Sequence, residues 1–231
     1  ADSMQVYDKL DILTNKPNKK ELKNSDCKLF SFLKYPEKCN VGLWRKKSIE
    51  LLNNIKKTPI FVGGTGLYLE SLINDISEIP KISNKIKLQI KKVFSKKGIN
   101  FFYEKLLKVD QNYAKKISPN DTQRILRAIE VKVATGKTFS DWHKQKKRRI
   151  FNKIVYVVLS TERKLLYERV NTRCFKMFKE GVVEEVESFL SNKCNDFHPL
   201  HKAIGLEPIS SLILGKINKE QCIEIFTQDT R

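Results

Sequence analysis

A cluster of polar side chains at the start of the chain has the residue types that acid–base chemistry needs. Asp2 is followed directly by Ser3, Met4 and Gln5. Such a short polar cluster fits the mouth of a parallel sheet, and a carboxylate held there can act as a general base. Spacing alone does not distinguish Asp2 from the other acidic residues, because the chain has 26 Asp and Glu residues in all.

A glycine-rich turn is the second candidate site. A β-branched and aromatic run over residues 58–62 ends in Gly63-Gly64-Thr65-Gly66, and apolar residues at helical spacing follow. This order predicts a buried strand, a tight turn and a helix. Backbone N–H groups in such a turn can approach a phosphate. A turn with a purely structural role is an equally weighted interpretation.

Basic residues in the middle of the chain form a third candidate site. Gln123, Arg124 and Arg127 are spaced so that they share one helix face. Together with Lys144 and the basic residues of 146–149, this face could contact phosphates and read bases. A solvated basic helix face explains the same pattern, and the residues alone favour it slightly.

Gly136-Lys137-Thr138 imitates the end of a Walker A loop. That loop needs an earlier glycine at the position where Val131 stands, and it follows a strand, whereas a helical pattern precedes Gly136. We therefore predict a helix C-terminus here. A nucleotide kinase that uses Lys137 is the weakest of the functional alternatives.

The histidines and cysteines give no sign of a metal site. His143, His198 and His201 have no acidic partner at a useful spacing, and we assign them structural roles. The five cysteines are odd in number and never spaced Cys-x-x-Cys, so neither a disulfide framework nor a zinc site is predicted. The reducing cytoplasm is the simplest location for such a chain.

The candidate residues need elements that position them, and the sequence pattern predicts two parts. Residues 1–76 and 148–231 have the strand–turn–helix order of an α/β core. Within this core, 153–160 is an almost uninterrupted apolar run, typical of a parallel strand that is covered on both faces. Residues 77–147 have helical periodicity and are predicted to form a helical insertion, with Asn120 or Asp121 as the N-cap of one helix.

Charge and composition narrow the class of protein. The 231 residues include 45 Lys and Arg against 26 Asp and Glu, a formal net charge of +19. A hydrophobic share of 40% can fill a core, and no apolar run approaches the ~20 residues of a membrane span. A disordered chain and a transmembrane protein are both disfavoured. The charge points to a polyanionic partner, nucleic acid first, although lysine enrichment without a binding role is the alternative.

Several short motifs occur in a fixed order along the whole chain. They are Ala1-Asp2-Ser3-Met4-Gln5-Val6-Tyr7, Leu10-Asp11-Ile12 with Thr14, Lys16 and Pro17, Val62-Gly63-Gly64-Thr65-Gly66-Leu67-Tyr68, Pro119-Asn120-Asp121, Arg127-Ala128-Ile129-Glu130, Glu185-Val186 and Lys202-Ala203-Ile204-Gly205. Together and in this order they closely resemble the tRNA dimethylallyltransferase (isopentenyltransferase) family. No single motif would suffice, but the ordered set is highly specific.

The resemblance implies a fold, an activity and partners. The fold is a P-loop NTPase-like α/β core with a parallel sheet, carrying a helical insertion that grips the anticodon stem-loop of tRNA. The activity is transfer of a dimethylallyl group from dimethylallyl diphosphate to N6 of the adenosine 3′ of the anticodon, adenosine 37, in tRNAs that read codons beginning with U. Mg²⁺ is the implied cofactor. A monomer in the cytoplasm without membrane contact is expected.

The resemblance also implies roles for individual residues. Asp2 aligns with the general base, and Arg169 and Arg173 are candidates for binding the diphosphate leaving group. The residues implied in tRNA binding are Asp2, Ser3, Met4, Gln5, Thr65, Lys87, Gln123, Arg124, Ile125, Leu126 and Arg127. No residue is assigned as a metal ligand.

The chain also departs from the family pattern. The Walker A loop that precedes the Asp2 cluster in the family is not among the 231 residues, and the family continues beyond Arg231 with a basic and aromatic helix. Leu13 stands where glycine is usual. We therefore expect a fragment or truncated product with an incomplete Mg²⁺ site and impaired catalysis. The alternative is a catalytically inactive, tRNA-binding remnant of the family.

Overall fold

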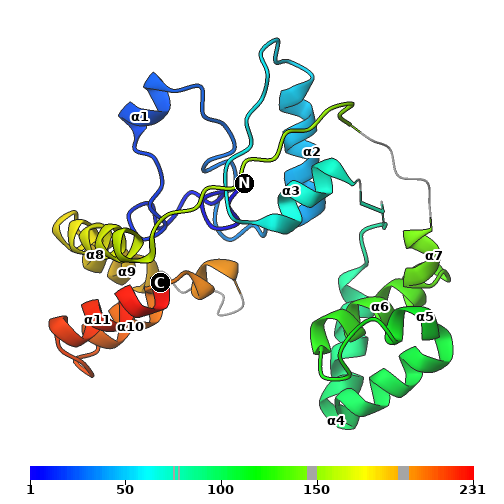
Figure 1. Cartoon of the computed structure of the whole chain (residues 1–231). Coiled ribbons are helices and arrows are strands. Elements are labelled where there is room, and N and C mark those ends of the chain that lie inside the picture. Colours follow the sequence, from blue (N-terminus) through cyan, green and yellow to red (C-terminus); the bar gives the residue numbers. More distant parts are fainter. Residues whose placement is uncertain (75, 78, 145–149, 192–197) are drawn as a thin grey trace. The chain divides into compact units, whose positions relative to one another are not determined.

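The computed structural model describes residues 1–74, 76–77, 79–144, 150–191 and 198–231 (Figure 1). The chain divides into two compact units. The first comprises Ala1–Glu70 and Lys153–Arg231, and the second comprises Ser71–Asn152. The second unit begins before and ends after the predicted insertion of 77–147, and each unit is described by itself below.

The second unit is built of helices. Its elements are α4 (Asn84–Val109), α5 (Gln111–Ala114), α6 (Thr122–Thr135) and α7 (Phe139–His143). Helix α4 bends at Gly98, which has a non-helical backbone. Buried apolar side chains from α4, α5 and α6 form one core, of which Phe102, Leu106 and Ile125 are members. The predicted helical character of this part of the chain is confirmed.

Local capping rules hold in the second unit. The Asp121 side chain accepts a hydrogen bond from the Arg124 N–H at 3.0 Å, so the predicted N-cap of α6 is confirmed. Helix α6 ends at Gly136, and the following Thr138 is the N-cap of α7. The prediction that Gly136-Lys137-Thr138 is a helix terminus is therefore confirmed, because a helix and not a strand precedes it.

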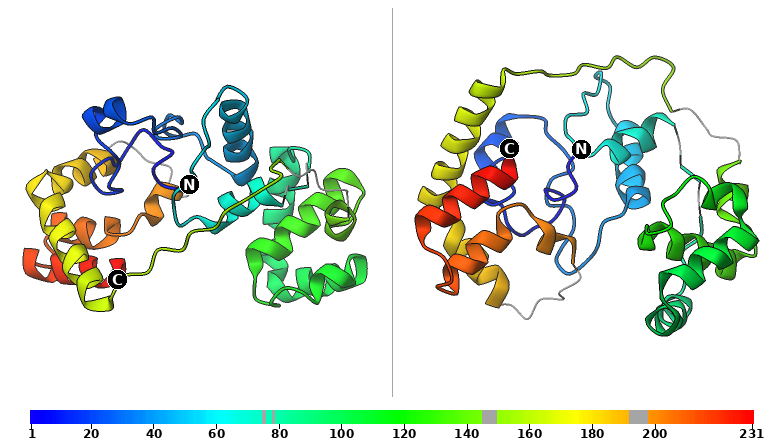
Figure 2. Two further views of the ribbon diagram at one scale, coloured as in Figure 1. Left: turned by 45° about the horizontal axis from the view of Figure 1, so that its top comes forward. Right: turned by 60° about the horizontal axis from the view of Figure 1, so that its bottom comes forward.

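The first unit combines irregular segments with a group of helices. Its elements are α1 (Lys19–Asn24), α2 (Val41–Leu52), the start of α3 (Gly66–Ile73), α8 (Arg163–Lys179), α9 (Val182–Ser191), the 3₁₀ helix η1 (Pro199–Lys202), α10 (Leu206–Ile213) and α11 (Lys219–Thr230). Helices α8 to α11 lie side by side (Figures 1 and 2). Gly205 precedes α10 with a φ of 90°, and a Cβ atom there would lie 2.4 Å from the buried Phe226 ring. Only glycine fits at this contact.

The predicted strands do not form in the described parts of the chain. Residues 58–62 and 153–160 have no strand assignment, and the side chains of the second run are exposed, with Val158 at 89%. A strand exists through hydrogen bonds to a neighbour, and no backbone hydrogen bond joins 153–160 to another described segment. The predicted parallel sheet is therefore not confirmed in the described residues.

A short parallel pairing involves the start of the chain instead. Tyr7 and Leu33 form an isolated parallel bridge. Around it, the N–H of Ser31 donates to Gln5 O and the N–H of Leu33 donates to Val6 O, both at 3.0 Å. Val6 and Tyr7 are buried. These contacts fix the segment that follows Asp2.

His198 connects η1 to the loop before α2. Its Nδ1 accepts a hydrogen bond from the Leu200 N–H at 3.2 Å, and its Nε2 lies 3.0 Å from Glu37 O. Because the Leu200 amide can only donate, Nδ1 carries no proton, and Nε2–H donates to the Glu37 carbonyl. The ring is buried against Tyr7 and Tyr35. The structural role predicted for His198 is confirmed.

Two further expectations concern the cysteines and the membrane. Cys27, Cys39, Cys174 and Cys222 are free thiols, whereas Cys194 lies outside the described residues. The described helices include none that is both long and apolar enough to cross a membrane.

We expect His198 to make the stability of the protein depend on pH. Burial lowers the pKa of His198 below its usual 6.5. Below this pH the unfolded chain binds a proton at His198 before the folded chain does, so the free energy of unfolding falls as the pH drops from about 6.5 towards the folded-state pKa. Urea unfolding at about pH 7.5 and about pH 5.5 measures this fall. A His198→Asn variant has no group that titrates in this range, so the fall should shrink. An unchanged fall contradicts the assignment, and His143→Asn is the control.

Candidate active site

The first three residues pair with the glycine-rich turn. The Ser3 N–H donates to Thr65 Oγ1 at 3.1 Å, and the Thr65 N–H donates to the Ala1 carbonyl at 3.2 Å. A Cβ atom on Gly63 would lie 2.2 Å from the Ala1 oxygen, so this close approach requires glycine. The structure therefore brings two of the predicted sites, the Asp2 cluster and the turn around Thr65, into one place.

The Asp2 carboxylate is held by its own turn. Its Oδ1 accepts hydrogen bonds from the Met4 N–H at 2.7 Å and the Gln5 N–H at 3.1 Å. Within the described residues, Oδ2 makes no hydrogen bond. One oxygen thus fixes the orientation of the carboxylate while the other can accept a proton.

Two tyrosines and a cysteine lie close to this turn. The Cys39 N–H donates to the Tyr7 hydroxyl at 3.0 Å, and Tyr68 hydrogen-bonds to the Cys39 side chain. Burial is the main cause that raises the pKa of Tyr68, and the negative charge of Asp2 adds to the rise. Burial likewise raises the pKa of Tyr7. Both phenols are protonated at neutral pH and can donate a hydrogen bond.

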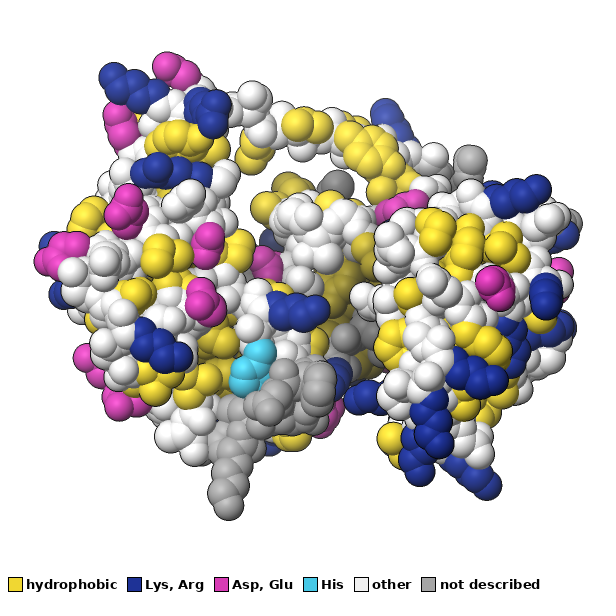
Figure 3. All heavy atoms as spheres, turned by 90° about the horizontal axis from the view of Figure 1, so that it is seen from below, with side chains coloured by type: hydrophobic (Ala, Val, Ile, Leu, Met, Phe, Trp, Pro, Cys, Tyr) yellow, Lys and Arg dark blue, Asp and Glu magenta, His cyan; other side chains and the backbone are white. Residues whose placement is uncertain are grey.

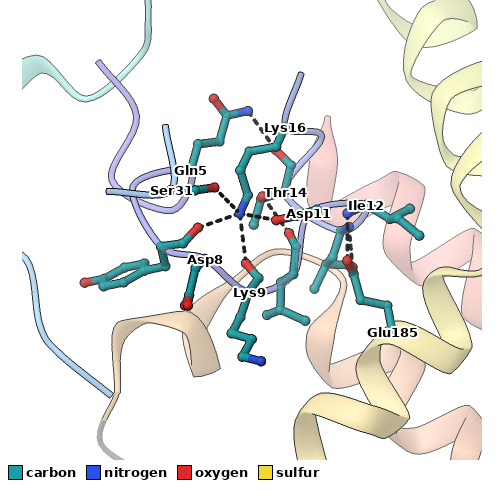
Figure 4. A network of polar contacts seen from close by, with 12 residues as sticks. Gln5, Asp8, Lys9, Asp11, Ile12, Thr14, Lys16, Ser31 and Glu185 are labelled. Carbon is teal, nitrogen blue, oxygen red and sulfur yellow. Dashed lines mark hydrogen bonds and ion pairs between the residues drawn. The ribbon is translucent and has the colours of Figure 1, made fainter. Parts of the chain in front are cut away.

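The loop that follows is shaped by a buried lysine (Figure 4). The Lys16 side chain is only 3% exposed, forms an ion pair with Asp11 and donates to the carbonyls of Tyr7 and Lys9 and to the Ser31 hydroxyl. A buried ammonium needs such partners, because desolvating it without them is costly. The ammonium group of Lys16 therefore holds the backbone of residues 7–16 together through these contacts.

Two residues of this loop have backbones that glycine usually adopts. Leu10 has a φ of 58° and Asn15 a φ of 52°. A left-handed backbone costs roughly 1 to 2 kcal/mol per non-glycine residue, so the surrounding contacts must enforce it. Leu13, which replaces a usual glycine, is buried and has no positive φ. The replacement is therefore compatible with the loop.

Gln5 is anchored to this loop. Its Nε2 donates to Thr14 O at 2.8 Å and to Asn15 O at 3.0 Å. Both partners are carbonyl oxygens, so the assignment of nitrogen and oxygen in the amide is fixed. The amide oxygen of Gln5 is left to accept a hydrogen bond.

Arg169 and Arg173 are not brought to the Asp2 turn. Both lie on α8 with exposed side chains. Within the described part of the chain no ion pair or hydrogen bond joins either one to residues 1–5 or to the turn around Thr65. Their role stays a prediction.

The second unit carries the other predicted binding residues. Gln123 and Arg124 are exposed and Arg127 is half-buried on α6, and Lys87 is exposed on α4. Ile125 has no exposed surface and belongs to the helical core, so its side chain cannot contact a partner. The basic residues at 146–149 lie outside the described residues.

The α6 arginines have weak partners of their own. Arg124 lies 3.3 Å from Asp121 and Arg127 lies 3.7 Å from Glu130. Exposed pairs of this kind contribute about 0 to 1 kcal/mol, so a phosphate can replace the carboxylate.

Positive charge is concentrated in this unit. Its sequence has 20 Lys and Arg against 7 Asp and Glu, an excess of 20 − 7 = 13 out of the chain's +19. Figure 3 shows the second unit on the right, where dark blue side chains outnumber magenta ones. This distribution fits a polyanionic partner.

A metal site is not found among these groups. No cluster of three His, Cys, Asp or Glu side chains that could hold a metal ion occurs in the residues that the structure describes.

Sequence reasoning missed three residues of this site. Lys16, Tyr68 and Glu185 all stand inside the ordered motifs, but their contacts have no local signal. Glu185 from α9 accepts hydrogen bonds from the loop across more than 170 residues of sequence. Only a comparison of many related sequences could have linked Glu185 to the loop.

A protein family model matches almost the whole chain. The family model described as IPP transferase matches residues 5–231. The tRNA dimethylallyltransferase of Pelagibacter ubique (strain HTCC1062) is 39% identical over 236 residues, which cover 100% of this chain and 75% of that protein. The tRNA dimethylallyltransferase of Bartonella quintana (strain Toulouse) is 36% identical over 234 residues, with 100% and 79% covered.

Solved structures agree with these relatives. A eukaryotic dimethylallyltransferase, determined in crystallographic snapshots of its action on tRNA, matches with a TM-score of 0.84 and 25% identity, covering 100% of this chain and 59% of that one. The full-length tRNA isopentenylpyrophosphate transferase from Bacillus halodurans matches with a TM-score of 0.63 and 26% identity, covering 99% and 72%.

Proposed function

The chain belongs to the IPP transferase family and is a tRNA dimethylallyltransferase, and we propose that it transfers a dimethylallyl group from dimethylallyl diphosphate to N6 of adenosine in tRNA. The target that we propose is the adenosine 3′ of the anticodon, in tRNAs that read codons beginning with U. The observation that carries the proposal at the site is the Asp2 carboxylate, held by two backbone N–H groups beside Thr65.

The chemistry explains why a fixed carboxylate is needed. The lone pair of an adenine amino group is delocalised into the ring, which makes N6 a poor nucleophile. As N6 bonds to C1 of the dimethylallyl group, the C1–O bond breaks and diphosphate leaves with its electron pair. In our proposal the N6 proton passes to the Asp2 carboxylate, which acts as general base.

The same site is suited to an extruded base. Chemistry on N6 requires the adenosine to leave the stack of the anticodon loop. We assign the turn of Ser3, Met4 and Gln5, with Thr65, to hold the extruded nucleotide. The support is that the Met4 and Gln5 N–H groups donate to the Asp2 carboxylate, that Ser3 donates to Thr65, and that the amide oxygen of Gln5 can accept a hydrogen bond from an amino group.

The leaving group and cofactor form a separate part of the proposal. Departing diphosphate gains negative charge that cations stabilise, and Arg173, with Arg169 one turn away on α8, is the candidate. Mg²⁺ stays an expectation, and no step here depends on it. A cytoplasmic monomer is likewise proposed.

The P-loop-like parallel sheet also belongs to the proposal. Its candidate strands are 58–62 and 153–160, and their support is a β-branched apolar composition. Amide hydrogen exchange across 154–159 tests this directly. Slow exchange would support a paired strand, and exchange at the rate of an unfolded chain would count against it.

An Asp2→Asn variant tests the base. Asparagine keeps an oxygen that accepts from Met4 and Gln5, so the turn is retained, but it cannot take a proton at neutral pH. We expect transfer of labelled dimethylallyl groups to unmodified tRNA to fall by about 10²- to 10⁴-fold. Asp8→Asn, in the same loop, is the matched control. Near-wild-type transfer by Asp2→Asn would overturn the base assignment, and tRNA binding without any transfer by the wild type would favour the inactive binding protein.

An Arg124→Ala variant tests the tRNA surface. If Arg124 contacts one phosphate, its loss should weaken binding. The negative slope of log K against log salt should become shallower by about 0.7 to 0.9. Filter binding to unmodified tRNA over a salt series measures the slope, and Lys46→Ala on α2 is the control. An unchanged slope would remove Arg124 from the interface, and equal affinity for tRNA and an unrelated duplex would reduce the interaction to nonspecific charge.

A further inference from the structure

Glu185 contacts the loop beside the candidate active site from a distant helix (Figure 4). Its Oε1 accepts a hydrogen bond from the Ile12 N–H and its Oε2 one from the Leu13 N–H, both at 2.9 Å. One carboxylate therefore binds two consecutive backbone amides. Such charge-assisted pairs are shorter and stronger than neutral hydrogen bonds.

Helix α9 holds Glu185 in place for this contact. Val182, Val186 and Phe189 on the same helix are buried. Glu185 lies in the first turn of α9, and its own N–H donates to the Gly181 carbonyl at 3.0 Å. Because its neighbours are packed on the core side, the side chain reaches the loop from a fixed backbone.

Glu185 and Lys16 complement each other. Lys16 binds backbone carbonyls of residues 7 and 9, whereas Glu185 binds the backbone amides of residues 12 and 13. Between them the loop turns through Leu10, whose φ is positive. An anion and a cation thus hold the two kinds of backbone polar group in a segment without regular secondary structure.

This loop ends in the groups that orient Gln5. Thr14 and Asn15, whose carbonyls accept from the Gln5 side chain, directly follow Leu13. The backbone N–H of Gln5 donates to the Asp2 carboxylate. A chain of contacts therefore runs from Glu185 through the loop to Gln5 and the Asp2 turn.

We infer that Glu185 is a positioning residue, which fixes the side-chain amide of Gln5 through the loop of residues 10–16. This rests on the proposed function, because it assigns Gln5 to the extruded adenosine. Without the Glu185 carboxylate, two amides lose their partners, and the backbone that carries the Thr14 and Asn15 carbonyls is held by fewer contacts. Gln5 then samples several orientations, and the adenosine is placed less often for attack.

The test combines a structural and a kinetic readout on the full chain. In Glu185→Gln one amide oxygen replaces two carboxylate oxygens, and an NH₂ group faces a backbone donor. We expect the Ile12 and Leu13 amides to exchange faster, the Gln5 side-chain amide resonances to shift, and kcat for transfer to fall about tenfold with the KM for tRNA nearly unchanged. Glu187→Gln, exposed on the same helix, is the matched control.

A double variant separates positioning from general destabilisation. If Glu185 acts through Gln5, adding Glu185→Gln to Gln5→Ala should reduce kcat little further. Additive losses, or unchanged exchange at Ile12 and Leu13, would overturn the inference. If Glu185→Gln does not fold, Glu185→Asp is used, which keeps the charge on a shorter side chain. Faster exchange at one of the two amides is then expected, and unchanged exchange at both would contradict the inference. If the wild type transfers nothing, the proposed function fails, while the exchange and Gln5 resonances still decide whether Glu185 positions Gln5.

Discussion

The first sixteen residues contain neither helix nor regular sheet, so the hydrogen bonds of their backbone have to come from elsewhere. Buried N–H and C=O groups without partners are costly, and native structures leave few of them. Asp2 supplies an acceptor for its own turn, Lys16 supplies donors to carbonyls, and Glu185 supplies acceptors to amides. The candidate active site depends on these three charged side chains more than on any element of secondary structure.

Charge is divided unevenly between the two units, and the charged residues of each unit have a different role. In the first unit Asp2, Lys16 and Glu185 bind backbone groups, and these contacts fix the geometry of the site. In the second unit most of the excess is exposed lysine and arginine on a helical scaffold with its own apolar core. Long-range attraction of a polyanion needs only net charge at a surface, whereas placing an adenosine for reaction needs fixed dipoles and directions.

Local rules predicted helices well and strands badly. The N-cap at Asp121 and the helix end at Gly136 follow from hydrogen bonds and backbone angles within a few residues. A strand depends on a partner that can lie anywhere in the sequence, and so the apolar run at 153–160 stays unpaired in the described structure despite its composition. Ile125 illustrates a related limit, because motif order placed it among binding residues while packing placed it in the core.

The sequence by itself determined the family, the helical character of the second unit, the concentration of positive charge and the candidate carboxylate, because motif order, periodicity and charge are properties of the chain. Only the tertiary structure decided that Thr65 lies against Ser3, that Gln5 is anchored by Thr14 and Asn15, and that Glu185 caps the amides of Ile12 and Leu13. Contacts between residues far apart in sequence leave no spacing to read. They follow from where packed helices and irregular backbone meet, and that is settled only when the whole chain has folded.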